Sequence, residues 1–143
     1  MRNDGYTGRL FEREVLGKCL VNWDGIMYLS YAESMDLVRK NQPCDPSDPD
    51  PRCANDLHAL IAEKLGLDDF SELKLYTAVG SPLDFWHGID GFFEFRGHVL
   101  TIDLTVNSHK DSGKANMIVH PDDLDHLELL AEGIAHLLYP EAV

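Results

Sequence analysis

Alternating hydrophobic and polar residues between positions 88 and 107 predict a β-hairpin. Arg96-Gly97 separates two runs rich in β-branched and aromatic residues, and a two-residue loop that contains glycine is the commonest hairpin connection. Such a short loop fixes the register, because side chains alternate between the two faces of a strand. In this register Asp90 faces Asp103, and both carboxylates lie on the same side of the hairpin.

Two facing carboxylates need a compensating interaction. Residues directly opposite one another have Cβ atoms roughly 4.5–5.5 Å apart, and like charges at that separation destabilise a sheet. A shared proton, an intervening Lys or Arg, or a divalent cation would offset the repulsion between Asp90 and Asp103. A metal site is the most specific of these interpretations. The alternative is a solvated sheet face on which the two carboxylates happen to align.

A third acidic residue lies on a helix predicted over residues 8–20. At about 100° per residue, the apolar positions of this helix fall within an arc of about 180°, and Glu12 lies near its middle. A carboxylate in an apolar stripe is costly unless it is paired or bound to a metal, so Glu12 needs a partner in the interior. Alternatively, Gly17 ends the helix early and leaves Glu12 at a solvated edge. The apolar positions are Phe11, Val15, Leu16, Cys19 and Leu20.

These three acidic residues resemble the restriction-endonuclease-like superfamily, the PD-(D/E)xK nucleases. Members of that family carry a Glu on an early helix, an Asp at the start of one strand and an acidic residue in the next strand. Glu12, Asp90 and Asp103 match these positions. The resemblance implies an α/β (α+β) fold with a restriction-endonuclease-like core, in which a mixed central sheet contains the β-hairpin and is flanked by helices.

The chain departs from the family pattern at one position. The family usually carries a Lys two residues after the second acid, and this position is Thr105 here. Lys110 and Lys114 follow in a polar segment and are the candidates for a relocated Lys. The presence of Thr instead of Lys at position 105 affects the prediction of catalysis more than the prediction of the fold.

The resemblance implies a metal-dependent phosphodiesterase, a hydrolase that acts on DNA. Asp90 and Asp103, with the carbonyl oxygen of Leu104, would hold one or two Mg²⁺ (or Mn²⁺) ions, which favour oxygen ligands. The metal would lower the pKa of a bound water and offset the charge on the leaving oxygen. Lys110 or Lys114 would stabilise the attacking water or the transition state.

The charge balance favours a second hypothesis. The chain has 12 Lys and Arg against 25 Asp and Glu, a net charge of −13, whereas nucleic-acid-binding proteins normally present a basic surface. A locally basic groove, a bound metal or a partner protein that supplies the DNA contacts would reconcile this charge with a nuclease. A non-catalytic binding or regulatory protein with the same fold, as a subunit of a larger assembly or a homo-oligomer, fits it as well.

The remaining pattern predicts a single domain over residues 1–143. Repeated Pro and Asp predict an exposed loop at about 41–53, and residues 22–40 are compatible with a strand or a helix. Asp84 and His87 lie just before Asp90; we interpret Asp84 as a turn or cap residue, and His87 either as such a residue or as a metal ligand or proton carrier. The other expected elements are a helix at 55–65, strands at 73–79 and 117–119, and a helix at 121–138.

The chain lacks the marks of a membrane or secreted protein. No apolar run approaches the ~20 residues that cross a bilayer, and the first residues lead into no signal-peptide core. The three cysteines are an odd count without metal-ligand spacing, so reduced thiols are expected. These features predict a cytoplasmic protein without a membrane partner.

Overall fold

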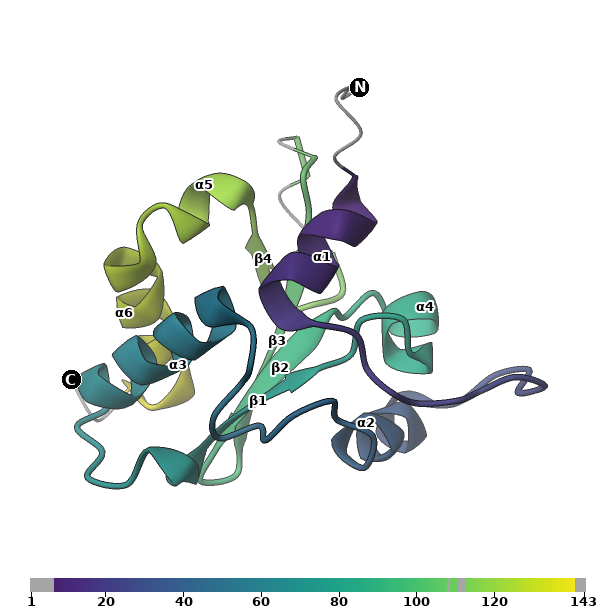
Figure 1. The fold of residues 1–143 in the computed structure, drawn as a ribbon, viewed down its shortest axis with the longest axis horizontal. Coiled ribbons are helices and arrows are strands. Elements are labelled where there is room, and N and C mark those ends of the chain that lie inside the picture. Colours follow the sequence, from purple (N-terminus) through teal and green to yellow (C-terminus); the bar gives the residue numbers. More distant parts are fainter. Residues whose placement is uncertain (1–6, 108, 111–112, 141–143) are drawn as a thin grey trace.

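One mixed four-stranded sheet lies at the centre of the computed structural model, which describes residues 7–107, 109–110 and 113–140 (Figure 1). The first three strands form an antiparallel meander, and the fourth pairs parallel with the third. Parallel neighbours need a crossover connection, which residues 105–116 provide. In spatial order the strands are β1 (Leu73–Thr77), β2 (Gly91–Phe95), β3 (His98–Leu104) and β4 (Met117–Val119).

The register of the β2–β3 hairpin confirms the sequence prediction. Arg96 and Gly97 form the turn with φ values of 49° and 83°, and two positive φ angles match the turn to the twist of the strands. The Asp90 amide donates to the Ile102 carbonyl at 2.9 Å, so the pairing continues beyond the end of β2. Asp90 and Asp103 therefore lie side by side, as the sequence predicts.

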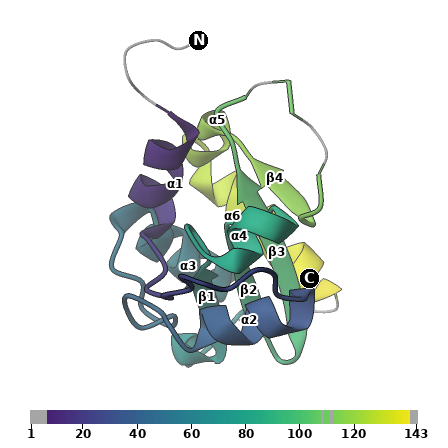
Figure 2. The same cartoon turned by 90° about the vertical axis from the view of Figure 1, so that its right-hand side faces the viewer.

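Helices cover both faces of the sheet. Helices α3 and α6 lie on one side, and Figure 2 shows α2 and α4 on the other. Among the described residues, no helix is long and apolar enough to cross a bilayer. The helical segments are α1 (Gly8–Leu16), α2 (Tyr31–Arg39), α3 (Arg52–Lys64), η1 (Phe70–Glu72, a 3₁₀ turn), α4 (Pro82–His87), α5 (Pro121–Leu124) and α6 (Leu127–Leu138).

The two faces of the sheet pack into two apolar cores. Phe93 and Phe95 belong to the core beneath α3 and α6, whereas Phe92 belongs to the core beneath α2 and α4. All three rings are at most 1% exposed, and burial of one such side chain contributes about 1.5–3 kcal/mol. Because both faces are covered, β3 is buried from Leu100 to Leu104. This excludes a solvated sheet face as the environment of Asp103.

Two predicted helices are wrong in extent. The first ends at Leu16 instead of residue 20, because Gly17 adopts φ 79° and its amide closes the last turn on the Arg13 carbonyl. The predicted helix at 121–138 is divided into α5 and α6. The amides of Asp125 and His126 bond to carbonyls three residues back, which tightens the chain into a turn and ends α5.

Capping residues account for the elements that the pattern left open or missed. A capping box between Ser30 and Glu33 starts α2, so residues 31–39 are helical. The pattern predicts no helix over residues 82–87, but Ser81 caps α4, Pro82 occupies its first turn and Gly88 ends it at φ 69°. Helix α3 begins at Arg52, slightly before the expected start at 55.

Candidate metal centre

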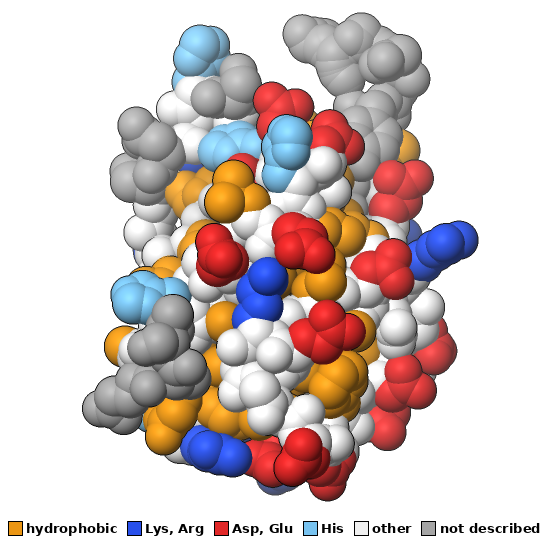
Figure 3. Space-filling model, turned by 90° about the vertical axis from the view of Figure 1, so that its left-hand side faces the viewer, with side chains coloured by type: hydrophobic (Ala, Val, Ile, Leu, Met, Phe, Trp, Pro, Cys, Tyr) orange, Lys and Arg blue, Asp and Glu red, His pale blue; other side chains and the backbone are white. Residues whose placement is uncertain are grey.

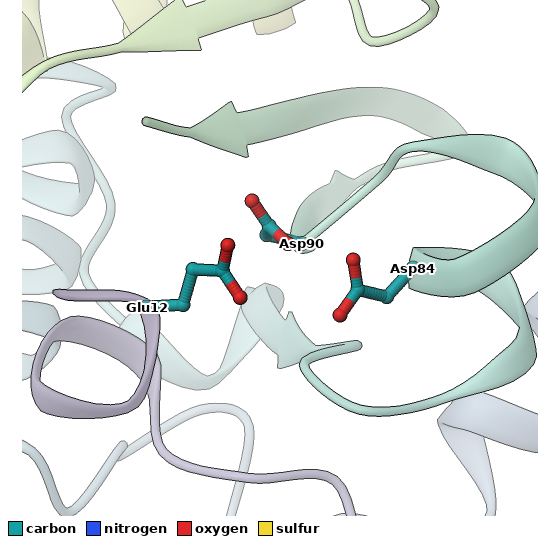
Figure 4. Close-up of side chains that lie close together, drawn as sticks. All are labelled: Glu12, Asp84 and Asp90. Atoms are coloured by element: carbon teal, nitrogen blue, oxygen red, sulfur yellow. The ribbon is translucent and has the colours of Figure 1, made fainter. Parts of the chain in front are cut away.

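Three carboxylates meet where α1, α4 and the start of β2 come together. Glu12 projects from α1, Asp84 from α4, and Asp90 directly precedes β2. Each offers an oxygen atom, and these atoms lie within 4.8 Å of one another. Figure 4 shows the three side chains pointing toward a common centre. We call these residues the carboxylate cluster.

Asp90 is the innermost member of the cluster, with only 1% of its surface exposed. Its Oδ2 atom accepts a hydrogen bond of 2.7 Å from the Leu104 amide. Burial raises the pKa of Asp90 well above its ordinary value, and a hydrogen bond with Asp103 and the charges of Asp84 and Glu12 raise it further. A carboxyl group in this position holds a proton unless a cation replaces it.

Asp103 is held by a lysine from the crossover between β3 and β4. Lys110 Nζ lies 2.6 Å from Asp103 Oδ2, and the exposed fractions of the two side chains are 38% and 11%. This short ion pair raises the pKa of Lys110. Gly113 lies beside the pair: a Cβ atom there would be 3.6 Å from Lys110 Cε and 3.8 Å from Asp103 Oδ2.

The backbone around Lys110 is anchored on both sides. Its amide donates to the Asn107 carbonyl at 3.1 Å, and its own carbonyl oxygen lies 2.9 Å from His120 Nε2. Thr105 serves the same loop, because its Oγ1 atom accepts a hydrogen bond of 3.0 Å from the Asn107 amide. The crossover therefore carries the ammonium group back to Asp103 although position 105 lacks a lysine.

Lys114 points elsewhere. Its ammonium group donates to the Trp86 carbonyl at 3.2 Å, at the end of α4. Of the two lysines that the sequence offered, the structure thus brings Lys110 to the acidic residues. Nothing in the local sequence distinguishes the two, because both lie in the same polar segment.

Glu12 occupies the rim of the cluster and is half-buried. Burial, the charge of Asp84 and, to a lesser extent, the charge of Asp103 raise its pKa to about 7, although the charges of Arg9 and Lys110 oppose the increase. Helix α1 ends early, as one of the two sequence interpretations has it. Glu12 nevertheless lies next to Asp84 and Asp90 and is only partly exposed to solvent.

Asp84 has two roles that the sequence interpretation separated. Its Oδ2 atom accepts a hydrogen bond of 2.9 Å from the Gly80 amide, which closes the turn before α4. The same carboxylate belongs to the cluster, so its assignment as a turn residue alone was incomplete. The sequence would have predicted that Asp84 joins the cluster only if the helix over residues 82–87 had been recognised.

His87 lies outside the cluster. Its Nε2 atom is 3.0 Å from the Leu29 carbonyl, and its ring contacts Tyr28 and Tyr31 with centroid separations of 5.9 Å. The structure therefore supports a packing role for His87. A part in proton transfer or metal binding would require it to leave these contacts.

Carboxyl groups outnumber cationic groups at the site. Three carboxyl groups surround Asp90, and the Lys110 ammonium group contacts only Asp103 among them. Such a site attracts a cation rather than an anion. No family model matches this chain, and no curated protein or solved structure matches it either. The chemistry of the site is therefore inferred from its own geometry.

Proposed function

We propose that this protein is a metal-dependent phosphodiesterase that hydrolyses DNA and has a restriction-endonuclease-like core. The observation that supports this best is the convergence of Glu12, Asp84 and Asp90 beside the Asp103–Lys110 ion pair. An early helix, the start of one strand and the following strand supply acids in the PD-(D/E)xK order. The lysine comes from the crossover rather than from β3.

The donor set fits Mg²⁺ or Mn²⁺. The cluster offers only oxygen ligands, which lie within 4.8 Å of one another. A small movement of these side chains would bring their oxygen atoms to the metal–oxygen distance of about 2.0–2.1 Å that Mg²⁺ requires. Glu12, Asp84 and Asp90 would hold the ion, with Asp103 and the Leu104 carbonyl nearby at the end of β3. When bound, such an ion supplies Lewis acidity toward a phosphate oxygen and lowers the pKa of a bound water.

The protein groups around the ion take separate tasks. The Leu104 amide fixes the orientation of Asp90 by donating to its Oδ2 atom. The Lys110 ammonium group stabilises negative charge on the phosphate in the transition state. Glu12, at the rim, would complete the ligand set, because a bound cation favours the carboxylate form of a group whose pKa is about 7 in the metal-free site.

The acidic surface favours a second candidate function. Figure 3 shows Asp and Glu side chains spread over the face of α3 and α6, with few Lys or Arg among them. The net charge of −13 repels a nucleic acid everywhere except near local positive charge. A binding or regulatory protein that keeps this fold without turnover, paired with another protein or with itself, is consistent with this surface.

A turnover assay separates the two functions. Purified protein with Mn²⁺ should cut plasmid or oligonucleotide DNA, and Asp90→Asn or Asp103→Asn should lower the rate by at least about 100-fold, because each alters charge at the reacting phosphate. Lys110→Met should cause a similar loss, whereas the matched control Lys40→Met, which changes an exposed lysine at the end of α2, should retain most of the activity.

Two outcomes contradict the nuclease. Wild-type protein that binds Mn²⁺ in a calorimetric titration but cuts neither DNA nor RNA would point to the non-catalytic function. Cleavage that survives both aspartate substitutions would come from another site or from a contaminating nuclease.

A further inference from the structure

Helix α4 carries aromatic rings next to its cluster carboxylate. Phe85 and Trp86 directly follow Asp84, and they meet Trp23 and Tyr28 from the segment before α2. The ring centroids of Trp23 lie 5.7 Å from Phe85 and 5.0 Å from Trp86, and Tyr28 lies 5.4 Å from Trp86. We call these four residues the aromatic patch. Helix α4, which carries two of these rings, faces the viewer in Figure 2.

Two rings of the patch are exposed, and the two Trp rings beneath them are half-buried. Phe85 is 71% exposed and Tyr28 is 60% exposed, so these rings are not part of either apolar core. Trp23 Nε1 donates to the Gly80 carbonyl at 3.0 Å, which ties the segment to the turn before α4. Grouped exposed rings of this kind mark interaction sites.

Two lysines flank the patch in an otherwise acidic protein. Lys114 Nζ bonds to the Trp86 carbonyl at 3.2 Å. The Lys18 side chain passes Gly80, whose carbonyl binds Trp23, with its Cε atom 3.3 Å from the position that a Cβ atom would take at Gly80. The patch therefore combines aromatic faces with positive charge, which is the combination that binds the bases and the phosphates of a single strand.

We propose that the aromatic patch stacks the bases of single-stranded nucleic acid and that single strands are the substrate class of the neighbouring cluster. This inference rests on the proposed function. A duplex hides its base faces within the helical stack, whereas a single strand offers them to aromatic side chains. Because Phe85 and Asp84 are neighbours on α4, a base stacked on the patch leaves its phosphates within reach of the cluster.

Intrinsic fluorescence tests this directly, because the chain has two Trp residues and both belong to the patch. The full-length protein is titrated in EDTA at low salt with oligothymidylate or oligouridylate of about 12 nucleotides, and with a duplex of the same length. We expect both, or at least one, of the single strands to quench the Trp emission and the duplex to leave it nearly unchanged. The DNA and RNA strands distinguish the two sources of the ligand.

Matched variants locate the binding. Phe85→Ala should weaken single-strand binding about 10-fold, the loss typical of one stacking ring, while Phe85→Tyr should restore it. The control is Leu129→Ala, since Leu129 on α6 is also 71% exposed. Circular dichroism shows whether each variant is folded, and the rescue by Tyr separates stacking from loss of structure.

The outcomes of this test and of the turnover assay are distinct. Quenching by single strands without hydrolysis would support the patch and contradict the proposed nuclease. Hydrolysis of duplex DNA without any quenching by single strands would overturn the patch and leave the nuclease standing. Equal weakening by Phe85→Ala and Leu129→Ala, or a dimer in sedimentation that Phe85→Ala dissociates while single strands fail to quench, would also overturn it.

Discussion

Replacing Glu12 with Gln should stabilise the metal-free protein at alkaline pH and abolish its response to metal. The substitution keeps the shape of a half-buried side chain and removes a negative charge from beside Asp84 and Asp103, whose charges help to raise its pKa. In the metal-free protein the negative charge of Glu12 lowers the free energy of unfolding. With a divalent cation bound, the same charge becomes a ligand.

The magnitude follows from the pKa of Glu12, which rises from 4.5 to about 7 on folding. At 1.36 kcal/mol per unit, the whole shift would correspond to roughly 3 kcal/mol, and solvent around this half-exposed group reduces it to the order of 1–2 kcal/mol. Below pH 4.5 Glu12 is protonated in both the folded and the unfolded chain. As the pH rises from 4.5 to 7, only the unfolded chain releases the proton readily, so the wild type loses this stability.

Thermal unfolding in EDTA between pH 4 and pH 8 measures the effect. Glu12→Gln should match the wild type near pH 4 and exceed it at pH 8 by roughly 3–6 °C, at about 3 °C per kcal/mol for a chain of this size. Added Mn²⁺ at about 100 times its dissociation constant should stabilise the wild type at pH 8 by about 2.7 kcal/mol. It should leave Glu12→Gln nearly unchanged.

The control variant is Glu132→Gln, which removes an exposed carboxylate from α6. It should change neither the pH profile nor the metal response. If the thermal stability of Glu12→Gln changes with pH from 4 to 8 in parallel with that of the wild type, the charge of Glu12 does not destabilise the folded protein and the reasoning is refuted. Undiminished stabilisation of this variant by Mn²⁺ would show that Glu12 is not a ligand.

Two further predictions concern the packing beneath the site and the lysine beside it. Gly91→Ala should lower the free energy of unfolding in urea by about 1–3 kcal/mol, because the added Cβ would lie 2.8 Å from the Tyr76 carbonyl oxygen. The control Gly133→Ala, with nothing within 4 Å of its new Cβ, should be neutral or stabilising. Equal losses of stability in the two variants would contradict the prediction. His120→Ala should lower kcat about 10-fold with little change in KM, because it frees the Lys110 carbonyl, and His120→Asn should recover part of the loss. A fall in stability at unchanged kcat would instead make His120 a purely structural residue.

The sequence by itself determined the hairpin and the pairing of its acidic residues. Short-range rules were sufficient, because a two-residue turn leaves one register and side-chain alternation then assigns each residue to a face. Asp90 and Asp103 therefore faced each other before any tertiary contact was known. Strand β4 was likewise predicted at residues 117–119. Caps at Ser81 and Gly88 would also have predicted α4.

Only the tertiary structure decided which other groups join that pair. Glu12 reaches Asp90 because α1 packs at the end of the sheet, and this contact joins segments far apart in the chain and leaves no periodic trace in it. Asp84 is close to Asp90 in the sequence, but it joins the cluster only because α4 turns its carboxylate toward Asp90. The choice of Lys110 over Lys114 depends on the path of the crossover, which the Asn107 and His120 contacts fix. Local pattern specifies register and face, whereas the packing of distant elements specifies which charges share a site.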